Sequence, residues 1–475
     1  MPSYSEAKRT AERTLQQICG EAPMHELHKS GITKIRSLLG GSHSVVTYPP
    51  LDSLVPTSDP NVIMASFSNP TAHIYIHIPF CESRCTFCHY VVALSKGIRD
   101  TTEKQSSVAH YLTALKLEIT ATASQCAKQN ISIASVYIGG GTPFILSEEQ
   151  IIDLITTLKN SFSFIQAAEW CFEASPLTIT APEGKQKLAC LQKLGITRLS
   201  FGIQSFDDEV LRIAGRGYTS KTAIEACQLA AHYFENWNVD LIQGLYYGST
   251  KEVWQNIQIL LTLRPPHITW YHGRFSSDRP QGMWRDKKQE AFETEHDTLV
   301  GRLLLWQELQ KHGYTQIDGN RFVRATSFID PFKKIRTSIH HDLIGLGVSA
   351  YGHTASWFYR NTISIAGYIK MVHEKQSAIA TARYFSEEEK IAASYVVGLR
   401  TERYETERCT SNQMQTPVVK YYKKKIAHFK KLGLLEACGL DGTGLKLTLR
   451  GRLFEDEILA SYYSPTVREY LRKKK

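Results

Sequence analysis

Three cysteines, Cys81, Cys85 and Cys88, have the residue type and the spacing for redox chemistry. A C-x₃-C-x₂-C loop supplies three thiolates, which can hold three irons of a cubane cluster and leave the fourth iron without a protein ligand. A small molecule can then bind that fourth iron. The spacing therefore predicts a [4Fe–4S] cluster with an open, catalytic position.

Two other uses of cysteine fit less well. A structural zinc site normally has two well-separated ligand pairs, and although His77 and His89 lie near the triplet, no second pair follows it. A disulfide requires a secretory context, whereas the segment Met1–Gly20 is polar and has no apolar signal core. The cluster remains the favoured interpretation.

The composition is that of an ordinary globular protein, with 475 residues and 42% hydrophobic content. This allows one large domain and a smaller one. Because no membrane-length apolar stretch, signal peptide or lipidation motif is visible, we expect a soluble monomer of the reducing cytoplasm. The other cysteines lie mostly in apolar-periodic stretches and are expected to pack in the core: Cys19, Cys126, Cys171, Cys190, Cys227, Cys409 and Cys438.

The formal net charge of +10 raises the question of a nucleic-acid partner. Much of the excess lies in two C-terminal runs, Lys420–Lys425 and Arg472–Lys475. Solvated helix faces and a frayed tail explain these runs more economically than a binding patch. A nucleic-acid partner is therefore not expected.

Six short runs rich in β-branched or aromatic residues alternate with amphipathic helical stretches. This alternation predicts βα units with a parallel sheet, an α/β fold of the partial (β/α)₆ TIM-like barrel type. The expected strands are His73–Ile78, Ala134–Ile138, Glu169–Glu173, Arg198–Ile203, Val239–Leu245 and His267–Tyr271. The expected helices between them are Tyr111–Lys128, Glu148–Asn160, Lys185–Leu194, Lys221–Phe234 and Glu252–Leu263.

The regions on either side of the barrel have other patterns. Residues 1–70 are expected to be an N-terminal extension and wrapping linker, residues 71–365 the barrel with its own C-terminal extension, and residues 366–475 a mostly helical, winged-helix-like domain with a basic tail. The last domain is expected from helices at Ser386–Gly398 and Thr416–Leu432 and strands at Leu434–Cys438 and Leu445–Leu449.

In parallel sheets the chemistry collects at the carboxyl ends of the strands. The cysteine loop follows the first strand, and Gly139-Gly140-Gly141-Thr142-Pro143 follows the second. Consecutive glycines let the backbone approach a ligand and expose its N–H groups, which suits the amino-acid end of a small molecule. Taken alone, such a turn is more often ordinary turn chemistry.

Polar residues embedded in apolar strands need hydrogen-bonding partners. Glu173, Gln204 and Asp240 stand at or near the ends of three successive strands. Any one of them is as easily a satisfied core group as a ligand contact. Several around one barrel mouth favour a ligand.

With these motifs in place, the chain resembles the radical S-adenosylmethionine (SAM) superfamily, and specifically its branch related to oxygen-independent coproporphyrinogen III oxidase. The resemblance covers about residues 71 to 460. It rests on the segments Tyr75–Cys88, Gly140–Pro143, Arg198–Phe206, Leu211–Arg216, Asp240–Leu245 and Gly345–Gly352.

The resemblance implies that the three cysteines hold a [4Fe–4S] cluster whose open iron chelates the methionine end of SAM. One electron from the reduced cluster, delivered by a flavodoxin or ferredoxin, then gives a 5′-deoxyadenosyl radical. It further implies that Tyr75 lies beside the cluster and that Phe87 contacts the adenine. The remaining SAM contacts that it implies are Gly140, Gly141, Thr142, Glu173, Gln204, Arg216 and Asp240.

Departures from the family pattern bear on the finer function. Coproporphyrinogen oxidases typically have a fourth cysteine two residues after the third, and this chain has Tyr90 at that position. The replacement argues against true coproporphyrinogen oxidation. The haem-chaperone relatives typically carry Asp after the third cysteine, where this chain has His89. The Gly-Leu pair ending at Leu245 is followed by Tyr246 and Tyr247, where both relatives usually have proline.

These features look more like the radical methyltransferases and cyclopropanases of the same branch, which act on natural products. We therefore expect transfer of a methyl or methylene group to an sp² carbon with two bound SAM molecules. Ser349 and Tyr351 are the expected second-SAM contacts, although a well-packed loop explains them equally well. A coproporphyrinogen oxidase-like enzyme and a haem-binding protein remain alternatives, and a tRNA-modifying enzyme ranks last.

The substrate is expected to be a small molecule, and its identity is not evident from the sequence. Specificity lies in variable loops on a common fold. Five residues are suggested as pocket residues only by their position at the ends of strands. They are Tyr246, Tyr247, Trp270, His272 and Arg274.

Overall fold

A thirteen-stranded mixed sheet forms the centre of the protein, seen here in a computed structural model. The structure describes residues 2–33, 47–57, 59–94, 101–273, 275, 279–336, 341–400, 417–438 and 444–473. The strand order within the thirteen-stranded sheet is β1-β15-β14-β13-β12-β2-β5-β6-β7-β8-β9-β11-β10. The middle of this order follows the chain, as expected for successive βα units.

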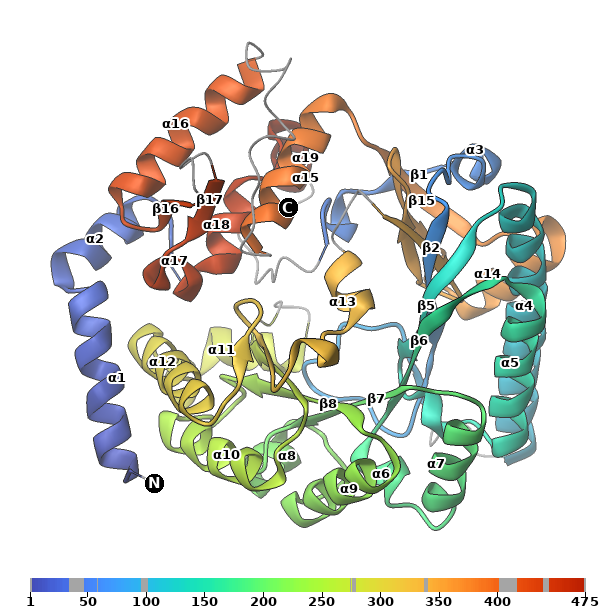
Figure 1. The fold of residues 1–475 in the computed structure, drawn as a ribbon, viewed down its shortest axis with the longest axis horizontal. Helices are drawn as coiled ribbons and strands as arrows, with labels where there is room; N and C mark the ends of the chain where they lie inside the picture. Colours follow the sequence, from blue (N-terminus) through green and yellow to red (C-terminus); the bar gives the residue numbers. More distant parts are fainter. Residues whose placement is uncertain are drawn as a thin grey trace.

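All six expected strands are present, and neighbours in sequence pair in parallel. They are β2 (Thr71–Ile78), β5 (Ser132–Gly140), β6 (Phe164–Ala174), β7 (Arg198–Gln204), β8 (Asn236–Gln243) and β9 (His267–His272). The connecting helices cover the outer face in Figure 1: α4 (Thr101–Lys128), α5 (Glu148–Ser161), α7 (Gly184–Lys193), α9 (Ser220–Tyr233) and α10 (Thr250–Leu263). The partial α/β barrel is confirmed.

The sheet continues beyond both edges of the expected barrel. On one side β12 (Asp342–Leu346) pairs in parallel with β2, and antiparallel strands follow it: β13 (Tyr351–His353), β14 (Trp357–Asn361), β15 (Ile379–Tyr384) and β1 (Val55–Pro56). On the other side β11 (Arg321–Val323) pairs with β9, and β10 (Thr315–Gln316) with β11. The sequence did not predict these strands, most of which are too short for a clear period-2 pattern.

Strand β2 shows how the barrel wall is built. Ile74, Ile76 and Ile78 are fully buried in the main hydrophobic core, and each stabilises the fold by about 1.5–3 kcal/mol. The alternate residues His73, Tyr75 and His77 share the opposite face because side chains alternate along a strand. This face lines the barrel interior.

A short helix, α13 (Pro331–Ile335), fills part of that interior. The ring of Phe332 stacks on Tyr137 with ring centroids 4.4 Å apart, and on Tyr75 at 5.5 Å. Ile335 belongs to the same cluster of buried side chains. The helix lies near the centre of the molecule in Figure 1, and its residues place the following Arg336 at the carboxyl ends of the strands.

The C-terminal region is mostly helical, as expected. Helices α15 (Glu387–Arg400) and α16 (Pro417–Lys431) precede a hairpin of β16 (Leu435–Cys438) and β17 (Gly444–Leu447). Cys409 and the turn at residues 439–443 lie outside the described residues, as do Lys474 and Lys475. Three helices that the sequence did not predict follow: α17 (Leu449–Leu453), α18 (Glu455–Ser461) and α19 (Pro465–Lys473).

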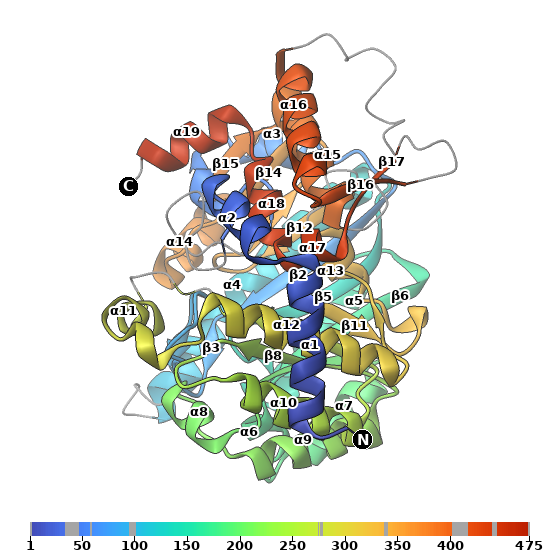
Figure 2. The same ribbon diagram turned by 90° about the vertical axis from the view of Figure 1, so that its left-hand side faces the viewer.

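The N-terminal residues pack along the barrel. Helix α1 (Tyr4–Ile18) lies against α12 (Glu295–Lys311), as Figure 2 shows, and the hydroxyl of Tyr4 lies 2.8 Å from that of Thr250 on α10. Helix α2 (Glu21–Lys29) follows, then α3 (Pro60–Met64) after β1. The remaining elements are β3 (Phe80–Cys81), β4 (Ala93–Leu94), α6 (Pro176–Ile179), α8 (Asp208–Ile213), α11 (Pro280–Lys287), α14 (Ile365–Lys375) and four single 3₁₀ turns (Leu51–Ser53, Pro143–Ile145, Gln289–Ala291 and Thr326–Phe328).

Two further expectations concern the core and the membrane. Five of the scattered cysteines (Cys19, Cys126, Cys171, Cys190 and Cys227) are buried free thiols, and Cys438 is half-buried. Among the described residues, no helix is both long and apolar enough to cross a bilayer.

Candidate active site

The three-cysteine loop leaves the carboxyl end of β2 and folds back on itself. Strand β3, which contains Cys81, pairs with β4, so the loop is closed at Leu94. Inside it, the N–H of Cys88 donates to the carbonyl of Cys85 over 3.2 Å. Cys85 is buried, whereas Cys81 and Cys88 are half-buried. The triplet is therefore a compact loop at the barrel mouth, by which we mean the carboxyl ends of β2 and β5–β9.

Each thiol contacts a different part of that mouth. The sulfur of Cys81 lies 3.2 Å from the hydroxyl of Thr142, and the guanidinium of Arg216 donates to the sulfur of Cys85 over 3.0 Å. Burial raises the pKa of Cys88 to about 11. The neighbouring thiols of Cys85 and Cys81 raise this pKa further, so all three sulfurs are close enough to interact.

The glycine turn after β5 is packed against the residues that precede the cysteines. A side chain at Gly141 would come within 2.5 Å of the carbonyl oxygen of Phe80, and Gly140 has a φ of +110°. The N–H groups of Gly141 and Thr142 donate to the carbonyls of Ile78 and Phe80, at 2.8 and 2.7 Å. The turn thus requires glycine because it continues the sheet beneath the cysteine loop.

This arrangement corrects one expectation about the turn. The N–H of Gly140 also has a partner, the carboxylate of Glu173 at 3.1 Å. Because the N–H groups of Gly140, Gly141 and Thr142 all donate within the protein, they are not exposed to a ligand. The turn could still bind an ammonium group through its carbonyl oxygens. Its contact with the methionine end of SAM therefore stays a prediction.

The acidic residues of the expected SAM site lie on the inward face of the barrel. Glu173 accepts a 2.5 Å hydrogen bond from the hydroxyl of Tyr137. Asp240 accepts one from the side-chain amide of Asn238 at 2.8 Å. Both carboxylates are half-buried, and together they make the β6–β8 side of the mouth acidic.

Gln204 and Arg216 meet at the end of β7. Gln204 has a left-handed φ of +74°, at a register shift between β7 and β8. Arg216 donates to the carbonyl of Gly202 over 2.7 Å and to the hydroxyl of Tyr218 over 2.8 Å, besides its contact with Cys85. Arg216 thereby connects the register shift at the end of β7 to the cysteine loop. Because a guanidinium has five N–H groups, it still has donors for a ligand.

Tyr75 is fixed beside the loop by His77. Its hydroxyl lies 2.9 Å from Nδ1 of His77, and Nε2 of His77 lies 2.9 Å from the carbonyl of Val91. Burial lowers the pKa of His77 to about 4. A neutral ring with Nε2–H donating to Val91 leaves Nδ1 to accept from Tyr75.

Ser349 and Tyr351 also reach the mouth. The ring of Tyr351 lies 5.5 Å from that of Tyr75. Ser349, with a φ of +62°, accepts a 3.1 Å hydrogen bond from Arg360. These two residues therefore stand on the β12–β14 side, across from Glu173 and Asp240.

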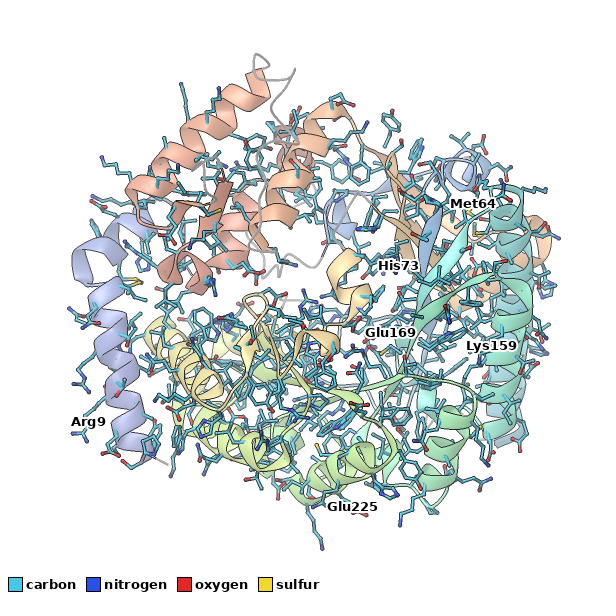
Figure 3. The ribbon with its side chains drawn as sticks, viewed as in Figure 1. Arg9, Met64, His73, Lys159, Glu169 and Glu225 are labelled. Carbon is cyan, nitrogen blue, oxygen red and sulfur yellow. The ribbon has the colours of Figure 1, made fainter. Side chains whose placement is uncertain are left out.

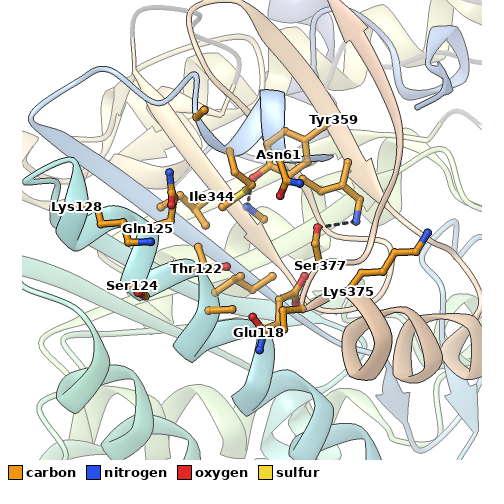
Figure 4. Close-up of a pocket in the computed structure, with 17 residues that line it drawn as sticks. Asn61, Glu118, Thr122, Ser124, Gln125, Lys128, Ile344, Tyr359, Lys375 and Ser377 are labelled. Atoms are coloured by element: carbon orange, nitrogen blue, oxygen red, sulfur yellow. Dashed lines mark hydrogen bonds between the residues drawn. The ribbon is translucent and has the colours of Figure 1, made fainter. Parts of the chain in front are cut away.

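Glu118 on α4 holds this loop from behind. It accepts hydrogen bonds from the N–H of Gly347 at 2.7 Å and from the hydroxyl of Tyr368 at 2.6 Å. A cavity of about 390 Å³ lies beside Glu118, between α4 and the outer face of β12, β14 and β15 (Figure 4). This cavity is outside the barrel and is separate from the candidate site.

The expected adenine contact and substrate pocket are only partly brought together. Phe87 and Tyr246 pack in one satellite cluster at the β7–β9 end of the mouth, whereas Tyr247 is 55% exposed. Trp270 is buried in the outer core, and His272 shares its face of β9. Arg274 lies outside the described residues.

Trp270 and His272 are therefore wrong as pocket residues. Tyr271, between them, faces the mouth, and its phenol raises the pKa of Tyr90 and Tyr351. Parallel strands covered on both faces lack a clean polar alternation, which is why the sequence did not reveal the inward residue. Sequence reasoning also missed Arg336 and Arg360, which stand on elements it did not predict.

The donor set suits an iron–sulfur cluster better than a single ion. In the described residues, no group of three or more His, Cys, Asp or Glu side chains is arranged to hold one metal ion. A cubane cluster contributes its own sulfide bridges and needs only thiolates at its corners. The loop supplies three such sulfurs, and no carboxylate or imidazole takes the place of any of these three thiolates.

Comparison with known proteins shows what this site is similar to. Residues 75–259 match the model of the radical SAM superfamily. The heme chaperone HemW of Buchnera aphidicola subsp. Acyrthosiphon pisum is 28% identical over 296 residues, 60% of this chain and 71% of that protein. HemW of Bacillus subtilis is 27% identical over 69% of this chain and 82% of its own length.

An oxidase matches a longer part of the chain. The oxygen-independent coproporphyrinogen III oxidase of Salmonella typhimurium is 24% identical over 86% of this chain and 88% of its own length. Coproporphyrinogen III oxidase of Escherichia coli superposes with a TM-score of 0.73 at 23% identity, covering 88% of this chain and 96% of that structure. That likeness shows the fold.

Transfer of a methyl or methylene group is not supported by these comparisons. A radical SAM methyltransferase of Kitasatospora setae superposes with a TM-score of only 0.33, which carries no argument. Over residues 75–259 the chain is thus similar to the radical SAM superfamily, a family that uses a [4Fe–4S] cluster and SAM, and over a longer part it is similar to the HemW heme chaperones and the oxygen-independent coproporphyrinogen III oxidases.

Proposed function

We propose that this protein cleaves SAM reductively to a 5′-deoxyadenosyl radical, which takes a hydrogen atom from a C–H bond of a small tetrapyrrole-type molecule and leaves as 5′-deoxyadenosine. The substrate radical would then pass one electron to an external electron acceptor, which makes the protein an oxidoreductase like the coproporphyrinogen oxidases. The observation that carries the proposal is the convergence of Cys81, Cys85 and Cys88 with Thr142 and Arg216 at one barrel mouth. The tetrapyrrole comes from the names of the relatives.

The cluster would be held by the three cysteines, and the chain's own residues would prepare the site around it. When bound and reduced by a flavodoxin or ferredoxin, such a cluster would supply the one electron that reductive cleavage of SAM requires. The carboxylates of Glu173 and Asp240 suit a cationic cofactor with ribose hydroxyls.

Other residues would orient the cofactor and exclude water. Arg216 fixes the cysteine loop to β7, and His77 orients the hydroxyl of Tyr75. Helix α13 closes the barrel interior below the site with Phe332. A dry, shaped site protects a radical from stray hydrogen donors.

The test is an anaerobic incubation of reconstituted protein with a reductant, methyl-deuterated SAM and coproporphyrinogen III. We expect 5′-deoxyadenosine together with loss of hydrogen from the tetrapyrrole and no deuterated methyl group in it. Label in the product would instead establish the methyl transfer that the sequence suggested. Absence of 5′-deoxyadenosine under all conditions would overturn the proposal.

A second candidate is a haem-binding carrier, favoured by the HemW relatives at 27–28% identity. Tyr90 in place of a fourth cysteine is compatible with it. Titration with haem decides, because a carrier gives a Soret band that saturates at stoichiometric haem. No such band at equimolar haem would exclude this function.

A further inference from the structure

The barrel mouth contains groups of opposite charge. Glu173 and Asp240 stand on β6 and β8 and Arg360 on β14, whereas Arg336 directly follows α13, among the phenols of Tyr351, Tyr271 and Tyr137. Tyr90 lies between them, 56% exposed, with its ring 6.2 Å from that of His77.

Arg336 is held rigidly by its own helix. Its N–H donates to the carbonyl of Phe332 over 2.9 Å, and Phe332 and Ile335 are anchored in the cluster around Tyr75 and Tyr137. The guanidinium shares a hydrogen bond with the phenol of Tyr351. A positioned cation at the end of a buried helix is a preorganised recognition group.

Within the described residues, Arg336 has no carboxylate partner. Its Nε is buried and makes no hydrogen bond. The titratable groups that act on it most strongly are four phenols, those of Tyr351, Tyr271, Tyr90 and Tyr137. A half-buried guanidinium without an anion is costly, and the cost is recovered when a ligand supplies one.

Arg360 stands beside this group on β14. It pairs in register with Tyr351, and it donates to the hydroxyl and carbonyl oxygens of Ser349 at 3.1 and 3.3 Å. Burial lowers the pKa of Arg360, and Asp52 opposes this effect. Two guanidiniums thus face the mouth over the rings of Tyr75 and Tyr351.

We infer that Arg336 is the specificity residue that binds a carboxylate of the substrate, with Arg360 adding a second positive charge and the rings of Tyr90 and Tyr351 contacting its unsaturated body. Guanidinium and carboxylate match in a two-pronged geometry, and tyrosine rings contribute large contact area at low entropy cost. The ligand class is a carboxylic acid with a body of unsaturated rings. This inference rests on the proposed function, since it concerns the substrate of that site.

The test compares two probes that differ only in charge. Coproporphyrin III has free carboxylates, whereas its tetramethyl ester has none, and binding of each to the reconstituted holoprotein is followed by fluorescence. The variant is Arg336→Gln, and the matched control is Arg324→Gln, an exposed arginine in the preceding turn. The iron and sulfide content of each variant reports whether the fold and cluster are intact.

We expect Arg336→Gln to weaken binding of the tetra-acid at least tenfold, to leave the weaker binding of the ester unchanged, and Arg336→Lys to restore part of the affinity. Arg324→Gln should bind both probes as the wild type does. Equal binding of the tetra-acid by wild type and Arg336→Gln, or an equal loss for both probes, would overturn the inference.

The carboxylate of a second SAM molecule is the other source of the same chemistry. Equilibrium dialysis with labelled SAM distinguishes the two sources. If Arg336 binds the second SAM molecule, Arg336→Gln would lower the number of bound SAM molecules and leave coproporphyrin binding intact. That result would also overturn the substrate assignment. If instead the wild type forms no 5′-deoxyadenosine but shows the charge-dependent binding, the proposed function fails and the carboxylate site stands.

Discussion

The barrel interior contains two polar layers that differ in how their charges are paired. At the amino ends of the strands, Arg198 is fully buried and forms a 2.9 Å ion pair with Glu169 on the next strand. At the carboxyl ends, Arg336 faces phenols. Figure 3 shows Glu169 and His73 near the centre of the view, whereas Arg9, Lys159 and Glu225 lie at its periphery.

Several polar side chains in the amino-end layer hydrogen-bond to one another. Asn238 donates to Ser200 over 3.0 Å and accepts from Thr269 at 3.0 Å, and His73 lies 2.7 Å from Ser135. Polar groups that satisfy one another stabilise a structure and leave little for a ligand. The contrast is between Arg198, which an acid of the chain pairs, and Arg336, for which we infer a role in recognition.

The largest expected effect is on the paired arginine. Arg198→Met removes the partner of the half-buried Glu169, which should cost about 3–5 kcal/mol of stability. Arg336→Met removes no such partner and should change stability by less than about 1 kcal/mol. Thermal melting of both variants checks this, and a melting temperature that falls equally in the two would break the comparison.

A buried acid that forms no ion pair within the described part of the chain extends the contrast to pH. Glu252 on α10 is 5% exposed, accepts hydrogen bonds from Ser205 at 2.5 Å and Asn256 at 2.6 Å, and has its pKa raised to about 7 by burial. Because this folded-state pKa lies above the unfolded value, its stability contribution is complete below about pH 4.5 and is lost as the pH rises through 7.

Glu252→Gln should therefore remove that part of the pH dependence. We expect the variant to gain on the wild type between pH 5 and pH 8 by up to about 3 kcal/mol. The measurement is the difference in melting temperature between the two proteins across that range. Parallel curves for wild type and variant would show that Glu252 is ionised in the folded protein at all these pH values.

The smallest effect should come from Tyr247. Its ring is 55% exposed, and its neighbour Tyr246 is the residue that packs in the satellite cluster. Tyr247→Ser should change stability by less than about 0.5 kcal/mol and leave binding of coproporphyrin III unaltered. Fluorescence titration checks the second point, and a tenfold loss of affinity would place Tyr247 in the substrate pocket after all.

Residues with strong local patterns predicted most of the barrel. The run around Ile74, Ile76 and Ile78 and the helices between strands follow directly from periodicity, so six strands were placed within a few residues. Strand β13 has three residues and helix α13 five, and their positions depend on tertiary pairing with β12, β14 and Tyr137. Such elements leave no sequence period to detect.

The site divides in the same way. Cys81, Gly141 and Glu173 could be found because type and spacing at strand ends point to them. Arg336 could not, since the role inferred for it depends on which described residues, distant in sequence, surround its guanidinium. The N–H of Gly141 donates to the carbonyl of Ile78, and this contact likewise depends on the tertiary structure and could not be predicted from the sequence.

The most direct test of the central claim is formation of 5′-deoxyadenosine from SAM by the reduced, reconstituted protein. We expect the wild type and Cys227→Ala, which alters a buried cysteine on α9, to form it and to show the iron–sulfur absorbance. Cys85→Ala should lack both. Wild-type turnover in Cys85→Ala would contradict the assignment of the three-cysteine loop as the reactive centre.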